Sequence, residues 1–300
     1  MEKIKLSETL QVSRIVLGLW RLSEWNMEKE EILHLMEECK ELGITTFDHA
    51  DIYGDYTCEA LFGEALALKP ALRRDIQIIT KCGIKLVSKN RPDHKIKYYD
   101  TSKKHIIHSV ENSLRNFRTD YVDLLLIHRP DPLMNPAEVA EAFAQLKAEG
   151  KVLNFGVSNF SPSQFHLLNS YLNFPLVTNQ VELSVSNLSQ FVNGCIEQCQ
   201  ERNIPPMAWS PLARGEIFYS ENEKEVRLRE TLHKIKGELN IDSIDQVMYA
   251  WLLNHPANII PIVGSGKVSR IRKAVDALNI HMTREQWFEV WQSSVGKEVD

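Results

Sequence analysis

Four side chains with complementary acid–base chemistry lie where three predicted strands end. Asp48 and Tyr53 are five residues apart at the end of one apolar run, Lys81 closes a second run, and His128 closes a third. The carboxyl ends of parallel strands meet at one edge or face of a sheet. A single shared site is therefore the most economical interpretation of these four positions.

These residue types point to chemistry on a carbonyl group. A tyrosine hydroxyl can protonate a carbonyl oxygen if its pKa, near 10 in water, is brought toward the working pH. A neighbouring ammonium does this by stabilising the phenolate, and Lys81 is the candidate ammonium for Tyr53. Asp48 would hold Lys81 in place and keep it charged, and His128 would orient the substrate through a hydrogen bond. None of these groups supplies electrons, so a hydride donor is required.

The elements that position these residues alternate along the chain between apolar runs and amphipathic stretches, which is typical of repeated βα units. Eight predicted strands end near Trp20, Ala50, Lys81, His128, Ser158, Glu182, Ser210 and Val263. Eight predicted helices cover about 28–42, 58–68, 101–117, 136–149, 161–171, 188–202, 225–239 and 267–278. This count predicts a closed (β/α)8 TIM barrel with its working face at the carboxyl ends of the strands.

The remaining segments predict additions to one barrel. Residues 6–15 read as an N-terminal β-hairpin that caps the bottom, and 243–254 and 283–292 read as extra helices. The chain has 300 residues, 43% of them hydrophobic, and a barrel of this kind takes about 250 residues. No repeat or flexible linker divides the sequence, so residues 1–300 are predicted to form a single domain.

Composition argues against several classes of partner. The net charge of −5 and the pI near 6.1 give no general attraction to nucleic acid or to an anionic membrane. No apolar stretch approaches the roughly 20 residues of a membrane span, and the first residues lack a signal-peptide core. Five scattered cysteines predict reduced thiols, and the pair Cys195 and Cys199 has no further ligand for a metal. We expect a cytoplasmic protein with a small-molecule carbonyl substrate and no metal.

With these residues in view, the chain resembles the aldo-keto reductase superfamily and looks like a bacterial oxidoreductase-like member. Residues 47–54, reading F-D-H-A-D-I-Y-G, with Glu59 and Gly63 downstream, are similar to the first signature of the family. Residues 146–158, reading L-K-A-E-G-K-V-L-N-F-G-V-S, are similar to the second. The resemblance covers nearly the whole chain. It implies an NAD(P)H-dependent (β/α)8 barrel with an Asp-Tyr-Lys-His catalytic tetrad.

The resemblance also implies roles for particular residues. The tetrad would be Asp48, Tyr53, Lys81 and His128, and Trp20 would form a wall of the substrate pocket beside Tyr53 and His128. Three residues would hold the nicotinamide carboxamide: Ser158, Asn159 and Gln180. Three residues after the seventh strand would line the pyrophosphate channel: Ser210, Leu212 and Gly215.

The last strand leads into a polar and basic segment that contains Gly264, Ser265, Lys267 and Arg270. A hydroxyl and two cations beside backbone amides at a helix start suit the adenosine 2′-phosphate of NADP. The segment departs from many relatives, which have a proline where Val263 stands and a Glu-x-x-Asn or Glu-Asn pair after the arginine, where this chain has Arg272, Lys273 and Ala274. The added positive charge still favours a phosphate over a bare ribose, so we expect NADPH.

The predicted function is NADPH-dependent reduction of aldehyde or ketone carbonyls to alcohols. Two alternatives remain open at this stage. Lys81 could form a Schiff base in an aldolase-type lyase, although a neighbouring Asp48 would oppose the low pKa this needs. The protein could instead bind NADPH as a redox-sensing regulatory subunit with little turnover. The physiological substrate, and whether the protein is a monomer or a weak homo-oligomer, do not follow from the sequence.

Three segments border the predicted mouth of the barrel. Residues 85–97 are rich in Lys, Arg and Asp and read as an exposed loop that is long enough for a lid. Arg129 follows His128 and could attract acidic substrates, although a surface salt bridge is the simpler expectation. Phe218 or Tyr219 could close over the site or pack without contacting a ligand.

Overall fold

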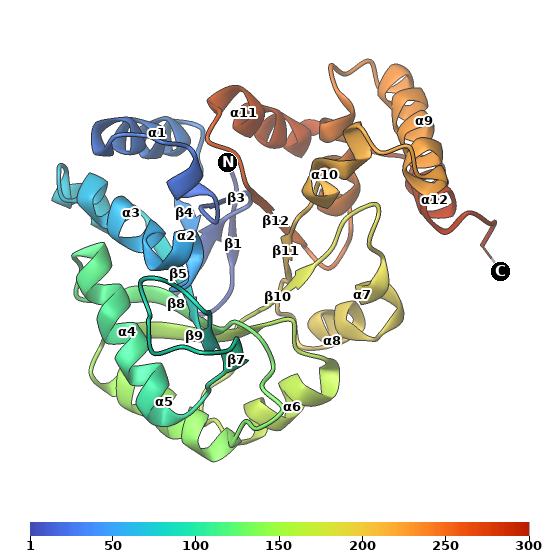
Figure 1. Cartoon of the computed structure of the whole chain (residues 1–300). Helices are drawn as coiled ribbons and strands as arrows, with labels where there is room; N and C mark the ends of the chain where they lie inside the picture. The colour runs from blue at the N-terminus through green and yellow to red at the C-terminus, as the bar shows by residue number, and fades with distance from the viewer. Residues whose placement is uncertain (300) are drawn as a thin grey trace.

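A closed barrel of eight parallel strands forms the centre of the computed structural model, which describes residues 1–299 (Figure 1). Every strand ends within two residues of its predicted position. Around the barrel the strands lie in the order β10-β11-β12-β3-β4-β5-β8-β9. Their bounds are β3 (Val16–Gly18), β4 (Thr46–Asp48), β5 (Gln77–Cys82), β8 (Val122–Ile127), β9 (Val152–Ser158), β10 (Asn179–Glu182), β11 (Met207–Trp209) and β12 (Ile260–Val263).

A hairpin closes one end of the barrel, as predicted, but it begins before the predicted range 6–15, because its first strand lies at 3–5. Strands β1 (Lys3–Lys5) and β2 (Gln11–Ser13) pair antiparallel, and the Ser7 hydroxyl between them donates to Asn154 at 2.7 Å near the start of β9. Apolar side chains of the hairpin join the barrel interior in one buried cluster, which contains Leu6, Leu10, Val12, Val16, Ile79, Leu124, Leu126, Val177, Met207, Ile260 and Ile262. The polar residues predicted to form the site lie at the opposite end of the barrel, at the carboxyl ends of the strands.

Most of the helices lie where the sequence predicts them. Their bounds are α1 (Lys29–Glu41), α3 (Cys58–Leu66), α4 (Lys103–Phe117), α5 (Pro136–Ala148), α6 (Pro162–Ser170), α7 (Ser189–Val192), α8 (Cys195–Glu201) and α11 (Val268–Asp276). Side chains of Ser102, Asn135 and Ser161 accept hydrogen bonds from the first turns of α4, α5 and α6, as N-caps do. The predicted helix at 188–202 is broken by Gly194, whose φ of 82° is left-handed.

One assignment from the sequence is wrong. Helix α10 (Ile244–Leu253), expected as an extra helix, packs on β12, whereas α9 (Glu223–Glu238), expected to cover the barrel, lies outside against α12 (Arg284–Val295) (Figure 1). Every residue of α10 from Ile244 to Leu252 is buried, but α9 buries only three. A helix that is apolar on all sides belongs in the interior, and one with a narrow apolar stripe belongs outside.

Short elements complete the fold. The turn α2 (Tyr53–Tyr56) precedes α3, and the strands β6 (Ile84–Lys85) and β7 (Tyr98–Tyr99) form a small antiparallel hairpin after β5. Four 3-10 segments are η1 (Leu22–Glu24), η2 (Pro70–Arg74), η3 (Ala213–Phe218) and η4 (Ala277–Asn279). Among the helices of residues 1–299, none combines the length and the apolar character needed to cross a membrane.

Candidate active site

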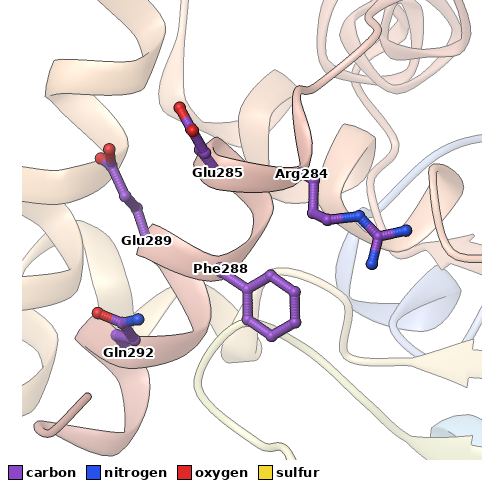
Figure 2. Close-up of a pocket in the computed structure, with 5 residues that line it drawn as sticks. All are labelled: Arg284, Glu285, Phe288, Glu289 and Gln292. Carbon is purple, nitrogen blue, oxygen red and sulfur yellow. The ribbon is translucent and has the colours of Figure 1, made fainter. Parts of the chain in front are cut away.

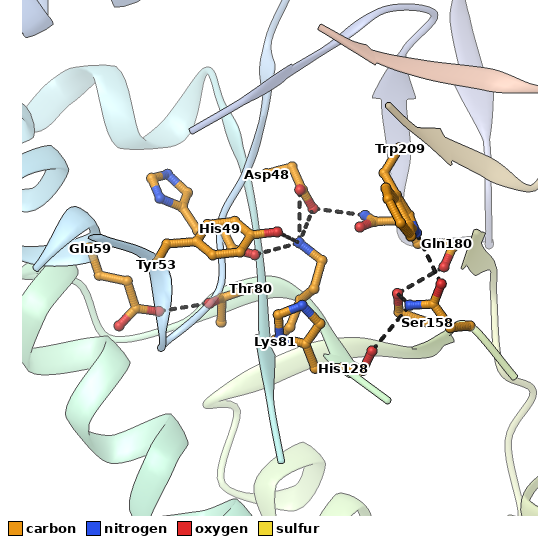
Figure 3. Close-up of polar contacts among 11 residues, drawn as sticks. Asp48, His49, Tyr53, Glu59, Thr80, Lys81, His128, Ser158, Gln180 and Trp209 are labelled. Atoms are coloured by element: carbon orange, nitrogen blue, oxygen red, sulfur yellow. Dashed lines mark hydrogen bonds and ion pairs between the residues drawn. The ribbon is translucent and has the colours of Figure 1, made fainter. Parts of the chain in front are cut away.

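Lys81 is the centre of a buried polar cluster at the carboxyl ends of the strands (Figure 3). Its Nζ donates to both carboxylate oxygens of Asp48, at 2.8 and 2.7 Å, and to the carbonyl oxygen of His49 at 2.6 Å. It also lies 3.2 Å from the Tyr53 hydroxyl. A buried ion pair persists only when further hydrogen bonds satisfy its atoms, and here each partner has more than one.

The alternation of side chains along β5 explains why Lys81 points inward. Ile79 belongs to the cluster inside the barrel, whereas the Thr80 hydroxyl faces outward and donates to Glu59 of α3 at 2.6 Å. Successive strand residues face opposite sides, so Lys81 returns to the interior. On the neighbouring strand, Asp48 is the last residue of β4 and meets Lys81 there.

The other two predicted residues complete the group. His128 directly follows β8, and its ring lies edge-on to the Tyr53 ring with 5.9 Å between centroids. The His128 backbone amide donates to the Cys82 carbonyl at 2.9 Å, which holds this strand end against β5. The structure thus brings together all four residues that the sequence singled out for carbonyl chemistry.

Burial and charge set the protonation of the cluster. Burial raises the pKa of Tyr53 above its ordinary value, against the opposing effect of the Lys81 ammonium, so the phenol is protonated at neutral pH. Burial lowers the pKa of Lys81, but the Asp48 carboxylate and the Tyr53 hydroxyl outweigh it, so that pKa is raised. Burial and the Lys81 charge hold the pKa of His128 well below its usual range, which makes the imidazole neutral. The sequence led us to expect a lowered pKa for Tyr53; burial reverses that sign here.

A second hydrogen-bonded group adjoins the first (Figure 3). The Gln180 side-chain amide donates to Asp48 Oδ1 at 2.8 Å, and the Ser158 hydroxyl donates to the backbone carbonyl oxygen of Gln180 at 2.8 Å. Asn159 Nδ2 donates to Ser158 Oγ at 2.8 Å. The three residues expected to hold a carboxamide therefore lie together, one hydrogen bond away from the acid–base cluster.

Trp209, the last residue of β11, belongs to this group although the sequence reasoning missed it. Its indole N–H donates to Asn159 Oδ1 at 3.0 Å. The guanidinium groups of Arg129 and Arg214 lie 5.5 and 5.7 Å from the centre of its ring. Arg129 forms no salt bridge with any residue in 1–299, so the simpler expectation for it is wrong; it contacts an aromatic face instead. An aromatic residue directly before Ser210 was the signal available in the sequence.

The loop after β11 has an unusual backbone. Ser210, Ala213 and Arg214 are not glycines, yet their φ angles are 52°, 49° and 57°, and Gly215 follows at 87°. Each non-glycine residue in this region costs on the order of 1–3 kcal/mol, and such strain concentrates at ligand-binding loops. Leu212 packs against the apolar core and anchors the loop.

The segment after β12 presents positive charge at the start of α11. The Ser265 hydroxyl accepts from the Lys267 amide at 3.2 Å, and Gly264 accepts from Arg21 at 3.2 Å. No side chain caps α11, and neither Lys267 nor Arg270 has an ion-pair partner within residues 1–299. Open backbone amides and unpaired cations suit an anionic group.

Several other candidates have structural roles. Both ring nitrogens of His49 are buried without a hydrogen-bond partner, and its ring packs edge-on against Phe62 and Phe117. Asp123 pairs with Arg73 at 2.8 Å. All five cysteines are buried free thiols, and no group of potential metal ligands occurs in the described chain. Trp20, expected to form a pocket wall, is 58% exposed after β3.

Two hollows lie near the surface. One, of about 470 Å³, lies on the outer face of α12 and is lined by Arg284, Glu285, Phe288, Glu289 and Gln292 (Figure 2). None of the residues singled out from the sequence lines it, and a single helix face encloses no ligand. The other, of about 310 Å³, adjoins Arg129, Asn159 and Trp209. It is therefore continuous with the polar group described above.

Comparison with known proteins gives consistent matches over the full length. The model of the aldo/keto reductase family matches residues 14–294. The uncharacterised oxidoreductase YcsN of Bacillus subtilis is 56% identical over 299 residues, which is 100% of both chains. A 6-dehydroglucose reductase of Agrobacterium fabrum is 45% identical over 300 residues, again 100% of both. The crystal structure of the thermostable aldo-keto reductase Tm1743 with the inhibitor epalrestat has a TM-score of 0.82 and 28% identity, covering 98% of this chain and 100% of that one.

Proposed function

The chain belongs to the aldo/keto reductase family of oxidoreductases, and from this premise we propose that it reduces aldehyde or ketone carbonyls to alcohols with NADPH, with Tyr53 as proton donor. The observation that carries the proposal is the chain of contacts from the buried Asp48 and Lys81 to the hydroxyl of the partly buried Tyr53, with His128 beside it. A protonated phenol next to a buried ammonium is an arrangement suited to donating a proton as negative charge develops on a carbonyl oxygen.

Each residue of the cluster has a distinct part in this proposal. Tyr53 gives its hydroxyl proton to the carbonyl oxygen, and the Lys81 charge stabilises the phenolate that forms. Asp48 keeps Lys81 protonated and in place through its two short contacts. The neutral His128 ring offers one N–H to the same carbonyl oxygen and thereby orients the substrate.

The residues near the barrel mouth fit a nicotinamide dinucleotide. Ser158, Asn159 and Gln180 offer hydroxyl and amide groups to a carboxamide, and the flat Trp209 ring beside them can stack against an aromatic ring. The strained loop from Ser210 through Leu212 to Gly215 would follow the pyrophosphate. When bound, NADPH supplies a hydride to the carbonyl carbon.

The preference for NADPH over NADH is supported by charge. Lys267 and Arg270, with Ser265 and Gly264 before them, gather at the uncapped start of α11 without an acidic partner in residues 1–299. A bare ribose would leave these cations unpaired, whereas a 2′-phosphate accepts charge-assisted hydrogen bonds from them.

The substrate class proposed for testing includes sugar aldehydes. The Agrobacterium fabrum relative is named a 6-dehydroglucose reductase, and it aligns over the whole of both chains. The hollow beside Trp209 is lined mainly by amide, hydroxyl and charged side chains, which favour a hydroxylated ligand over an apolar one.

Five buried free thiols are in keeping with the cytoplasmic location expected from the sequence.

Neither alternative function is favoured. A Schiff-base lysine must lose its proton near neutral pH, whereas Asp48 raises the pKa of Lys81. A redox-sensing regulatory subunit is not favoured, because the most similar proteins described above are named oxidoreductases or a reductase.

The first experiment follows the loss of NADPH absorbance with a panel of aldehydes, ketones and 6-dehydroglucose, using the native protein and Tyr53→Phe. We expect turnover in the native protein and a loss of about 100-fold or more in kcat for the variant, with NADPH binding retained. Binding is followed by quenching of tryptophan fluorescence. If the native protein binds NADPH but reduces none of the panel, the reductase proposal is wrong.

A further inference from the structure

The turn that carries Tyr53 is left-handed. Gly54, Asp55 and Tyr56 have φ angles of 56°, 58° and 69°, so three consecutive residues occupy a region that L-residues rarely adopt. Glycine tolerates it and aspartate enters it occasionally, but tyrosine is strained there. The backbone immediately after the proposed proton donor is therefore held in a conformation that it would leave if nothing opposed the strain.

Local contacts account for only part of this restraint. A Cβ at Gly54 would lie 2.5 Å from both Cys58 Sγ and Ser23 Oγ, so only glycine fits at that position. The Thr57 hydroxyl donates to the Gly54 carbonyl oxygen at 2.5 Å and closes the turn from the other side. Neither contact involves Asp55 or Tyr56, which carry the unfavourable φ angles, and the local hydrogen bond of the Tyr56 amide to the Ile52 carbonyl is long, at 3.4 Å.

The loop between β6 and β7, residues 86–97, reaches these two residues. Asn90 Nδ2 donates to the Asp55 carbonyl oxygen at 2.8 Å. The Leu86 amide donates to the Tyr56 hydroxyl at 2.9 Å, and the Arg91 guanidinium lies 4.4 Å from the centre of the Tyr56 ring. The loop thus contacts the backbone carbonyl of Asp55 and both the hydroxyl and the ring face of Tyr56.

The 86–97 loop is itself ordered by internal hydrogen bonds. The Asn90 amide donates to the Ser88 hydroxyl at 2.9 Å, and the Arg91 amide donates to the Ser88 carbonyl at 3.0 Å. A ring nitrogen of His94 lies 2.9 Å from the Leu86 carbonyl oxygen. A loop that is preorganised in this way can hold another segment, because its own ordering cost is already met.

We propose that the 86–97 loop is a positioning element for the proton donor: Asn90 and Arg91 hold the left-handed turn at Asp55 and Tyr56 and so keep the Tyr53 hydroxyl at Lys81. Asn90 and Arg91 act through the turn and are positioning residues. This inference rests on the proposed role of Tyr53, and it extends that role to a loop that the sequence suggested only as an exposed segment or lid.

The variant Asn90→Ala tests the proposal, since it removes the hydrogen bond to Asp55 from an exposed side chain. We expect kcat to fall about tenfold, because small displacements of a reacting group have large effects on rate. KM for NADPH should stay unchanged, because Ser158, Asn159 and Gln180 do not contact the loop. Tyr56→Phe, which removes the acceptor for Leu86, should act in the same direction. The matched control is Lys89→Ala, an exposed residue of the same loop without a hydrogen bond or ion pair in residues 1–299.

A double-mutant cycle distinguishes a loop that restrains the strained turn from a loop whose mutation only disturbs its own structure. Asp55→Gly relieves the strain at position 55, but not at Tyr56, and it keeps the carbonyl that Asn90 contacts at 2.8 Å while removing the longer 3.5 Å contact with the Asp55 carboxylate. In this background the loss caused by Asn90→Ala should shrink from about tenfold to about twofold, as coupled residues require. An equal loss in both backgrounds, or no loss in either, would overturn the proposal.

Hydrogen exchange gives a readout that is independent of turnover. Amides of residues 53–58 should exchange faster in Asn90→Ala than in the native protein, while the strand amides of β4 and β5 should not change. Unchanged exchange at 53–58 would overturn the proposed restraint even in an active enzyme. If Asn90→Ala exchanges faster at 53–58 but the native protein reduces no carbonyl, the restraint is supported while the reductase proposal fails.

Discussion

Asp51 shows how a single buried group can make stability depend on pH. Its side chain accepts a hydrogen bond from the Ser109 hydroxyl at 2.7 Å, and its other oxygen is buried without a partner among residues 1–299. Burial raises the pKa of this carboxyl to about 8, from 3.8 when it is exposed in the unfolded chain. Between these two values the folded protein holds a proton that the unfolded chain has released. The protonated Asp51 carboxyl therefore makes its full contribution to the free energy of unfolding at low pH, and this contribution is lost as the pH rises toward 8.

We predict that Asp51→Asn becomes increasingly stabilising, relative to the native protein, as the pH rises from 5 to 8. Asparagine has no proton to lose, and its carbonyl oxygen can still accept from Ser109. The difference in free energy of unfolding between Asp51→Asn and the native protein should change by at most about 1.4 kcal/mol per pH unit. Urea unfolding at several pH values measures it, with the exposed Asp120→Asn as control. Parallel pH curves for Asp51→Asn and the native protein would contradict the prediction.

At the scale of elements, the start of α11 is a surface whose charge has a specific use in the proposed function. Lys267 and Arg270 carry two positive charges beside open backbone amides and have no acidic partner within residues 1–299. Because the cluster is separate from Tyr53 in sequence and belongs to another strand end, cofactor choice and proton donation can be changed independently.

We predict that the double variant Lys267→Ala and Arg270→Ala raises KM for NADPH about 10- to 100-fold and changes KM for NADH by less than about threefold. Each lost charge-assisted hydrogen bond to a phosphate is worth roughly 1.5–3 kcal/mol, and NADH has no such phosphate. Steady-state kinetics with both cofactors is the measurement. The control is Lys273→Ala, because Lys273 already pairs with Asp245. Equal losses with both cofactors would place the phosphate elsewhere.

At the scale of the whole molecule, the C-terminal helices form a layer joined to the barrel through aromatic rings. The indole of Trp251 on α10 stacks on Trp287 of α12 with 4.7 Å between ring centres. Each indole N–H donates to the backbone carbonyl of the other residue at 3.0 Å. Phe191 of α7 packs edge-on against both rings. Since α10 covers β12, this cluster connects the outer layer to the barrel wall.

Trp251→Ala should destabilise the protein by about 3–5 kcal/mol, because it empties a fully buried site and leaves the Trp287 carbonyl without its donor. The proposed catalytic cluster around Lys81 lies at other strand ends, so kcat at low temperature should be close to that of the native protein. Chemical unfolding and kinetics on one preparation measure both quantities. A large loss of kcat in a fully folded variant would show that the outer layer also shapes the site.

The sequence by itself determined the barrel and the residues at its mouth. Alternating side chains and apolar runs are local patterns, and they predicted all eight strand ends and the grouping of Asp48, Tyr53, Lys81 and His128. Only the tertiary structure decided contacts between residues far apart in the chain. In the folded protein α10 covers the barrel and α9 lies outside it, the reverse of what the sequence predicted. The Arg129 guanidinium lies over the Trp209 ring, the Gln180 amide donates to Asp48, and the 86–97 loop contacts the turn after Tyr53. Local patterns report which face of an element is apolar, whereas the partner that covers this face, the sign of a buried pKa shift and the restraint of a strained turn depend on neighbours that folding alone brings together.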